Sequence, residues 1–272
     1  MNSDIMSFAA YLRKEERSAA TIEKYVREAG RFLRWLDGRT AGKELALAYK
    51  EALMGERTPA GVNGAVAALN CLFSFWGLPE CRMRSVKIQR RIFRDEEREL
   101  TEKEYRRLLA AAKGNRRLLL VMETICATGI RVSEVRYITV EAARAGRTDV
   151  TLKGKVRTLL LPAKLCRKLL KYAKAQKTAS GEIFVTKSGR GLSRGQIWQE
   201  MKSLCALAGV EPSKVFPHNL RHLFATVYYR ACRDIVKLAD ILGHSSINTT
   251  RIYLQTTGAE HARQLEQLRL VT

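Results

Sequence analysis

The chain has 272 residues, of which 49 are Lys or Arg and 27 are Asp or Glu, so its formal net charge is +22. Hydrophobic residues make up 46% of the sequence, which is enough to bury the core of one or two domains and excludes intrinsic disorder as the main description. No apolar run approaches the roughly 20 residues needed to span a bilayer, and the N-terminus lacks the pattern of a secretion signal. We therefore expect a cytoplasmic protein without a membrane span. Its charge favours a phosphate-bearing partner, either nucleic acid or an anionic lipid surface, and does not by itself choose between the two.

Apolar residues recur at helical spacing from residue 7 to about residue 76, which predicts a small bundle of about four helices without a strand. The clearest of these helices is Ile22–Leu36, with Thr21 as a candidate N-cap, and the last is Gly61–Trp76. A helical N-terminal domain over residues 1–81 is the expected result.

The stretch 82–98 is rich in basic residues and poor in apolar ones. It carries seven Lys or Arg and three acidic residues, so we expect it to contribute little core and to form an extended linker between two domains. Four of its basic side chains are candidate DNA contacts: Arg84, Lys87, Arg90 and Arg91.

The second domain, residues 99–272, begins with a capping box from Thr101 to Glu104 ahead of a helix. A helix over Arg116–Ala127 follows, and β-branched runs on both sides of Gly154 predict a hairpin. Further helices are expected over Ser193–Ala208, His218–Arg230, Asp234–Leu242, Ser246–Leu254 and Gly258–Leu268. The predicted fold class is mainly α with a small β-sheet, as a helical N-terminal domain followed by an α+β domain.

All four histidines fall in the last quarter of the chain. His218 and Arg221 are three residues apart on a predicted helix, so both project from one face and could bind an anionic oxygen. In isolation, the same pair could simply satisfy surface partners at a helix N-terminus. His218 and His222 also have the spacing of zinc ligands, but the Glu that a zinc peptidase needs after its first His is here Asn219. No metal site is therefore expected.

Two other segments carry candidate side chains. In Leu242–Tyr253 a helix ends at Gly243, His244 lies in the turn, and Tyr253 follows about two helical turns later. In Ala127–Glu134 the candidate is Arg131, just after a predicted helix end. Each has an ordinary structural explanation, since a lone tyrosine is commonly a half-buried core residue and a cation often satisfies carbonyls at a helix C-terminus.

Together and in this order, these motifs resemble those of the tyrosine recombinases, the family of phage integrases and Xer-like enzymes. The resemblance covers about residues 100–270. It rests on T-G-I-R-V-S-E at Thr128–Glu134, a hairpin lysine, H-N-L-R-H at His218–His222, L-G-H at Leu242–His244 and a tyrosine nine residues later. The N-terminal domain resembles the family's core-binding domain in helix pattern and position alone.

The resemblance implies a role for each residue. Tyr253 attacks a DNA phosphate and forms a 3′-phosphotyrosyl bond, while Arg131 and Arg221 bind the non-bridging oxygens, which gain charge in the pentavalent transition state. His218 and His244 donate further hydrogen bonds or handle the proton of the tyrosine. No ATP, metal or other cofactor is required, because the phosphotyrosine conserves the energy of the broken ester.

The predicted hairpin departs from the family pattern. Its turn, Leu152–Arg157, is shorter than the usual one, so Lys153 and Lys155 compete for the role of the acid that protonates the leaving 5′-oxygen. Lys153 is favoured because it precedes the hairpin glycine, and Lys155 then contacts DNA. Glu134 is expected to hold the catalytic residues in place without contacting the DNA itself.

The function implied is that of a site-specific DNA recombinase or integrase, of a mobile element or a chromosome. Its partner would be double-stranded DNA with an inverted-repeat site, bound by a homo-oligomer that is tetrameric at synapsis, with Ala259–Leu270 as a helix exchanged between subunits. Two alternatives stay open: a type IB topoisomerase, and a catalytically silent DNA-binding regulator. The second alternative predicts the loss of a catalytic residue, and none is lost.

Overall fold

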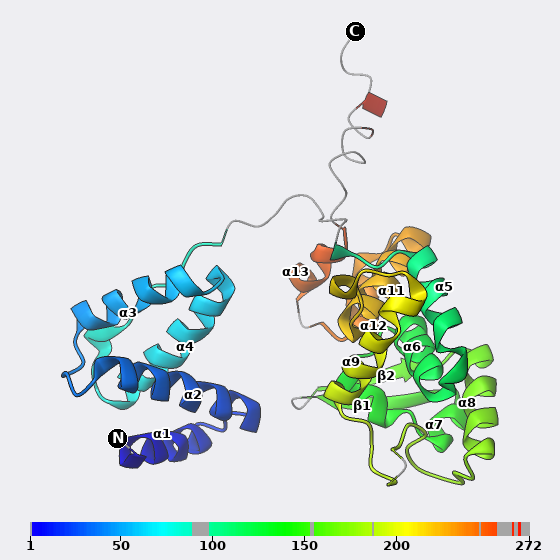
Figure 1. The fold of residues 1–272 in the computed structure, drawn as a ribbon, viewed down its shortest axis with the longest axis horizontal. Helices are drawn as coiled ribbons and strands as arrows, with labels where there is room; N and C mark the ends of the chain where they lie inside the picture. Colours follow the sequence, from blue (N-terminus) through cyan, green and yellow to red (C-terminus); the bar gives the residue numbers. More distant parts are fainter. Residues whose placement is uncertain are drawn as a thin grey trace. The chain divides into compact units, whose positions relative to one another are not determined.

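The computed structural model describes residues 2–88, 98–152, 155–186, 188–244, 246–254, 263 and 266–267. The chain divides between Arg91 and Ile92 into two compact units, and each unit has its own core (Figure 1). The division falls inside the predicted linker. The described residues are mostly helical with one two-stranded sheet, which confirms the predicted fold class. None of the described helices is long and apolar enough to cross a membrane.

Within its described residues the first unit is a helical bundle without a strand. Its elements are α1 (Asn2–Lys14), α2 (Ala19–Leu36), α3 (Lys43–Glu56), α4 (Pro59–Phe75) and the 3-10 turn Pro79–Cys81. The N-cap of α2 is Ser18, whose side chain accepts a hydrogen bond from the Thr21 amide, so the cap predicted at Thr21 is wrong by one turn. Phe32 and Phe73 meet edge to face at 5.6 Å between ring centroids in the centre of this core.

The start of the predicted linker belongs to the first unit, which corrects the expectation that it contributes little core. Met83 is buried in that core and Val86 packs against it, while Arg84 and Lys87 point outward and are exposed. The Asn70 amide binds both the backbone N–H and the carbonyl of Met83, at 2.8 and 2.9 Å.

Three other side chains hold the same segment. The Asn63 amide makes the equivalent pair of bonds with Val86, at 2.7 and 3.0 Å. The amines of Lys43 and Lys50, two turns apart on α3, donate to the carbonyls of Arg82 and Arg84. Few apolar residues are needed because side chains of the bundle satisfy the backbone of the segment.

The second unit builds its core around α6 (Arg116–Thr128), which packs on α11 (Pro217–Cys232) and α8 (Ala163–Ala175) (Figure 1). The other helices are α5 (Glu102–Ala111), α7 (Val140–Ala145), α9 (Arg194–Ser203), α10 (Cys205–Ala208), α12 (Ile235–Leu242) and α13 (Ile247–Thr250). Short 3-10 segments lie at Ala112–Gly114, Val132–Tyr137, Pro212–Lys214 and Arg251–Leu254. The capping box of α5 is present, with Thr101 and Glu104 bonded reciprocally.

The predicted hairpin is formed by β1 (Arg147–Leu152) and β2 (Lys155–Leu160), which pair antiparallel. In this register Leu152 pairs with Lys155, which leaves a turn of two residues, and Val150 pairs with Arg157. The short turn agrees with the short sequence between the two runs. The helix predicted over Ser193–Ala208 is divided into α9 and α10 at Leu204.

Candidate active site

Four segments that are distant in sequence converge in the second unit. They are the loop after α6, the first turn of α11, the turn after α12 and the 3-10 segment that follows α13. Together they bring four of the predicted residues into one cluster: Arg131, Arg221, His244 and Tyr253.

Gly129 makes the first of these segments possible. It ends α6 in the left-handed conformation, with φ of +65°, and a Cβ there would lie 2.4 Å from Cδ1 of Phe224 on α11. Both the backbone and the packing therefore require glycine. The close approach of the two helices brings the Gly129 carbonyl to 2.5 Å from the guanidinium of Arg221.

Arg221 is the most deeply buried cation of the cluster, with 2% of its surface exposed. Besides Gly129, it donates to the Leu242 carbonyl at 2.8 Å and to Nε2 of His244 at 2.9 Å. Burial and the charge of Arg131 lower the pKa of Arg221 to about 10, while the hydroxyl of Tyr253 acts in the opposite direction. At neutral pH the guanidinium therefore stays charged and fixed in place.

The tautomer of His244 follows from its two partners. Arg221 can only donate, so Nε2 of His244 must accept, and the ring proton lies on Nδ1, which donates to Oγ1 of Thr250 at 2.9 Å. Partial burial, followed by the charges of Arg221, Arg131 and Arg157, lowers the pKa of His244 to about 4. His244 is therefore a neutral imidazole with a lone pair at Nε2.

Tyr253 lies among aromatic rings and is almost fully buried, with 3% of its surface exposed. Its ring stacks on His244 at 6.1 Å between centroids and meets the edge of His222 at 4.8 Å. Leu238 and Leu242 of α12 belong to the same small apolar cluster. The chain thus places the tyrosine in its own site, next to its own arginines.

Arg131 is held at one side and open at the other. Its Nη1 pairs with Glu134 at 3.0 Å and its Nη2 donates to the Gly243 carbonyl at 3.3 Å, yet 31% of the side chain is exposed. The second oxygen of Glu134 accepts from the Arg131 backbone N–H at 2.8 Å. An anion can therefore reach this guanidinium without displacing the side chain that orients it.

Arg157 is a residue of the site that the sequence analysis missed. From β2 it pairs with Glu134 at 2.5 Å and also donates to the Ile241 carbonyl. Burial is the main cause of a lowered pKa for Arg157, and Glu134 opposes the shift. A Cβ at Gly243 would lie 2.6 Å from Cδ of Arg157, so the turn before His244 must be glycine. The only sequence signal for Arg157 is its place in the hairpin, two residues after Lys155.

The arginines share one docking point at the end of α12. Its last carbonyls, those of Ile241 and Leu242, and the carbonyl of Gly243 each accept from a different guanidinium: Arg157, Arg221 and Arg131 in that order. These carbonyls carry the partial negative charge of the helix C-terminus, which offsets the repulsion between the cations. Arg131 therefore does bind a carbonyl at a helix C-terminus, but at the end of α12 and not of α6, the helix that it follows, and this bond orients the arginine.

The remaining predicted residues are placed differently. His218 is exposed at the open side of the cluster, where partial desolvation and the charges of Arg221 and Arg131 lower its pKa. Lys153, Arg90 and Arg91 lie outside the described residues, as does the side chain of Lys155. Arg84 and Lys87 belong to the first unit, whose placement relative to the cluster is not fixed.

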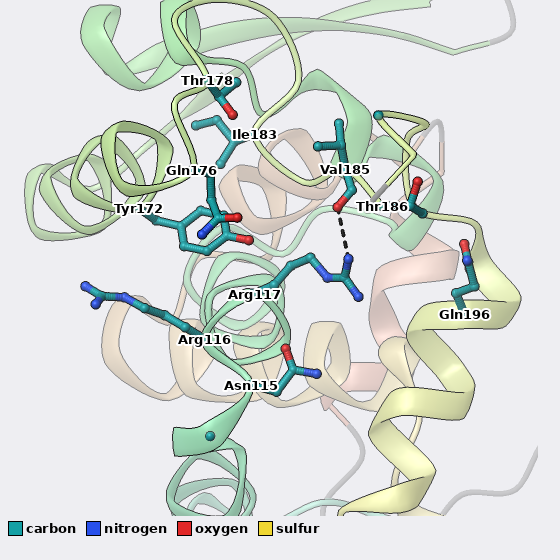
Figure 2. A pocket seen from close by; sticks show the side chains of 12 residues that line it. Asn115, Arg116, Arg117, Tyr172, Gln176, Thr178, Ile183, Val185, Thr186 and Gln196 are labelled. Carbon is teal, nitrogen blue, oxygen red and sulfur yellow. Dashed lines mark hydrogen bonds between the residues drawn. The ribbon is translucent and has the colours of Figure 1, made fainter.

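A cavity of about 900 Å³ lies at the opposite, N-terminal end of α6. Figure 2 shows Arg117 reaching across it to the Val185 carbonyl, at 3.0 Å, and the same guanidinium pairs with Glu200 of α9 at 2.7 Å. Arg117 therefore joins α6 to its neighbours and is not available for the cluster. No three His, Cys, Asp or Glu side chains in the described part of the chain come together in a way that could hold a metal ion.

Known proteins resemble this chain closely in sequence. The model of the phage integrase family matches residues 98–260. Tyrosine recombinase XerA of Pyrococcus furiosus is 31% identical, over 97% of this chain and 93% of that protein. Tyrosine recombinase XerD of Xanthomonas campestris is 32% identical, over 89% of this chain and 85% of that protein.

Solved structures resemble it in fold. A lambda integrase dimer bound to a COC′ core site superposes with a TM-score of 0.73 and 18% identity, covering 95% of this chain and 96% of that one. XerH recombinase bound to its difH substrate gives a TM-score of 0.70 and 21% identity, covering 94% and 84%. The chain shares the fold of these proteins.

Proposed function

This chain belongs to the phage integrase family of tyrosine recombinases, and we propose that it cleaves and rejoins DNA at a specific site with Tyr253 as the nucleophile. The observation that carries this proposal is the convergence of a buried tyrosine, two arginines and a neutral histidine from four distant segments of one chain. The structural explanations given above for each motif taken alone do not account for this convergence.

The chemistry is a transesterification. The Tyr253 oxygen attacks the phosphorus, the bond from phosphorus to the 5′-oxygen breaks, and the 3′-phosphate stays bound to the tyrosine while the 5′-hydroxyl strand leaves. Arg221 presents fixed positive charge and Arg131 offers an accessible guanidinium, so the charge that develops on the non-bridging oxygens meets donors that need no reorganisation. A 5′-hydroxyl from another strand reverses the step and joins the DNA.

Two proton transfers accompany attack. The tyrosine must lose a proton, and we assign its uptake to neutral His244, whose ring stacks on that of Tyr253. In the DNA-free site Nε2 of His244 accepts from Arg221, so this role requires that a bound phosphate takes over that hydrogen bond. To His218, which is exposed, we assign a hydrogen bond to a phosphate oxygen. For the leaving 5′-oxygen we retain Lys153 as the acid and Lys155 as its alternative, because both belong to the hairpin sequence, and Arg157 of the same hairpin pairs with Glu134 in the cluster.

The substrate we propose is double-stranded DNA with a short inverted repeat, bound by a homo-oligomer that reaches a tetramer at synapsis. The net charge of +22 suits the partner, and a lambda integrase of the same fold has been solved as a tetramer bound to a Holliday junction. We expect this substrate site to lie in cytoplasmic DNA, either in a chromosome or in a mobile element.

Covalent capture tests the proposal. The DNA flanking the gene is searched for an imperfect inverted repeat, and that repeat is made with a nick so that the short cleaved piece diffuses away. The protein should form a denaturant-resistant adduct with this DNA. Tyr253→Phe should bind the same DNA and form none, whereas Tyr229→Phe, which alters a neighbouring tyrosine of α11, should form it normally. An adduct with Tyr253→Phe would refute the assignment.

A further inference from the structure

The first described residues of the second unit are fastened to the first turn of α11. Asn219, which is 7% exposed, donates from its amide nitrogen to the carbonyls of Arg98 and Lys214, at 2.8 Å each. Asn219 lies between His218 and Arg221 in sequence. The helix turn that supplies two candidate catalytic residues therefore also holds the point at which the chain enters this unit.

The next residue, Glu99, continues the contact toward the tyrosine. Its Oε1 lies 3.6 Å from Nε2 of His222, and the two side chains are largely shielded, with 19% and 16% exposed. The opposite partner of His222 is Tyr253, whose ring it meets edge to face at 4.8 Å and 66°. Glu99, His222 and Tyr253 thus form a continuous series of contacts.

We propose that His222 is a positioning residue for the nucleophile and that Glu99 acts through it. This inference rests on the proposed role of Tyr253. The tyrosine ring has His244 stacked on it and the His222 edge against it, and the two contacts fix the direction of its hydroxyl. Attack in line with the leaving oxygen is sensitive to displacements of about 1 Å, so a ring that loses one contact attacks more slowly. Glu99 is among the first described residues of the second unit, next to the predicted linker. Through His222, this segment therefore helps to hold Tyr253 in position.

The experiment separates the nucleophile from the rest of the site. Single-turnover cleavage of the nicked repeat is measured at saturating DNA for His222→Ala, for His222→Gln, which keeps a donor for Glu99 but lacks the ring, and for Glu99→Gln. The same His222 changes are then combined with Tyr253→Phe, and hydrogen peroxide is supplied as the nucleophile. One oxygen of the peroxide attacks the phosphorus, the bond from phosphorus to the 5′-oxygen breaks, and the 5′-strand leaves as a hydroxyl with the proton that the peroxide gives up. The 3′-phosphate then carries a hydroperoxo group.

For a positioning residue the two assays must differ. Cleavage by Tyr253 should fall about ten- to hundredfold in His222→Ala and His222→Gln, with thermal unfolding and DNA affinity near those of the unaltered protein. Cleavage by peroxide should stay the same with and without the His222 change. Equal losses in both assays would overturn the inference, because His222 would then act on the phosphate or the leaving group, and so would undiminished cleavage by the tyrosine.

The link through Glu99 has its own test. Glu99→Gln should slow cleavage by Tyr253, and adding it to His222→Ala should cause no further loss, since the carboxylate acts through the imidazole. Multiplied losses in the double variant would refute the link. Glu102→Gln, which alters a nearby carboxylate paired with Arg106 on the surface of α5, is the matched control and should cleave normally. An adduct formed by Tyr253→Phe would mark failure of the proposed function instead.

Discussion

At the scale of single residues, the site depends on one buried carboxylate. Glu134 is 1% exposed and pairs with Arg131 on one oxygen and Arg157 on the other. A carboxylate removed from water is stable only while such partners remain. Glu134 thus connects the arginine that faces solvent to the strand that carries the hairpin tip.

Removing Arg157 tests this connection. Arg157→Gln leaves the buried Glu134 with one cation, and we expect the free energy of unfolding to fall by about 3 kcal/mol in urea titrations. Adding Glu134→Gln should recover part of this loss, because a neutral amide does not need a second cation. Arg136→Gln, at an exposed arginine of the same segment, serves as the control and should change stability by less than about 0.5 kcal/mol. A similar loss in both arginine variants would argue against a special role of the pair.

His244 makes stability depend on pH. In the folded protein its pKa is about 4, while in the unfolded chain it takes a proton below about pH 6.5. Between these values the unfolded state binds more protons, so the free energy of unfolding falls as the pH drops through this window. Since His244 is partly exposed, we expect its share to be about 2 kcal/mol between pH 7 and pH 4.5. His244→Asn should show a correspondingly flatter pH profile, and parallel profiles of the two proteins would contradict the assigned shift.

At the scale of secondary structure, apolar periodicity and capping residues predicted most of the helices but not the packing of the predicted linker. Most of the described helices followed from apolar spacing and caps, and the end of α6 followed from Gly129. The predicted helix Ser246–Leu254 is α-helical only over Ile247–Thr250, and Gly258–Leu268 lies almost wholly outside the described residues. The segment 82–88 was misjudged because its backbone is bound by Asn63 and Asn70, whose amides carry no periodic signal. Composition alone indicated a linker.

The same limit applies to the site. Arg131, Arg221, His244 and Tyr253 could be chosen from their motifs, since each stands beside a helix end. Arg157 could not, because its partner Glu134 precedes it by a helix and a strand, and its other acceptor lies at the end of α12. Long-range pairs of this kind become visible only in three dimensions.

Hydrogen exchange can test the attachment of the segment. The amide protons of Met83 and Val86 are bound by the side-chain oxygens of Asn70 and Asn63, so both should exchange slowly. Asn70→Ser should remove protection at Met83 and cost about 1–2 kcal/mol of stability in the first unit, because a buried polar backbone group loses its partner. Protection at Val86 should remain. Ser74→Ala, on the same helix, should alter neither amide, and fast exchange of Met83 in the unaltered protein would contradict the packing.

At the scale of the whole molecule, the charges are shared unequally between the units. Residues 1–91 carry 16 basic and 10 acidic side chains, for a net +6, and residues 92–272 carry 33 and 17, for a net +16. Ten peptide steps from Ile88 to Arg98 can span at most about 35 Å. Two basic bodies joined by so short a connection favour binding to neighbouring stretches of one DNA duplex as a clamp.

Two rows of exposed basic residues compete as the contact surface. On α2, in the first unit, Lys24, Arg27, Arg31 and Arg34 share one face, and Glu28, buried beneath them, pairs with Arg31 at 3.1 Å. On α8, in the second unit, Arg167, Lys171 and Lys174 are also exposed. Glu28 orients a member of the first row, whereas no ion pair in the described part of the chain holds a member of the second row. We therefore expect the row on α2 to bind phosphates.

The salt dependence of DNA affinity distinguishes the rows within the intact chain. Each lost phosphate contact should reduce the slope of log K against log salt by about 0.9, so the combined change Lys24→Gln, Arg27→Gln and Arg34→Gln should reduce it by nearly 3. Arg31 is left in place so that the buried Glu28 keeps both of its close partners, Arg31 at 3.1 Å and Arg57 at 2.8 Å. Cleavage at saturating DNA should be unchanged, because the row belongs to the other unit and not to the cluster around Tyr253. The matched triple change on α8, at Arg167, Lys171 and Lys174, should leave the slope as it is. A larger reduction of the slope in the α8 variant would contradict the proposal that α2 of the first unit binds phosphates. The main phosphate contacts would then belong to α8 of the second unit.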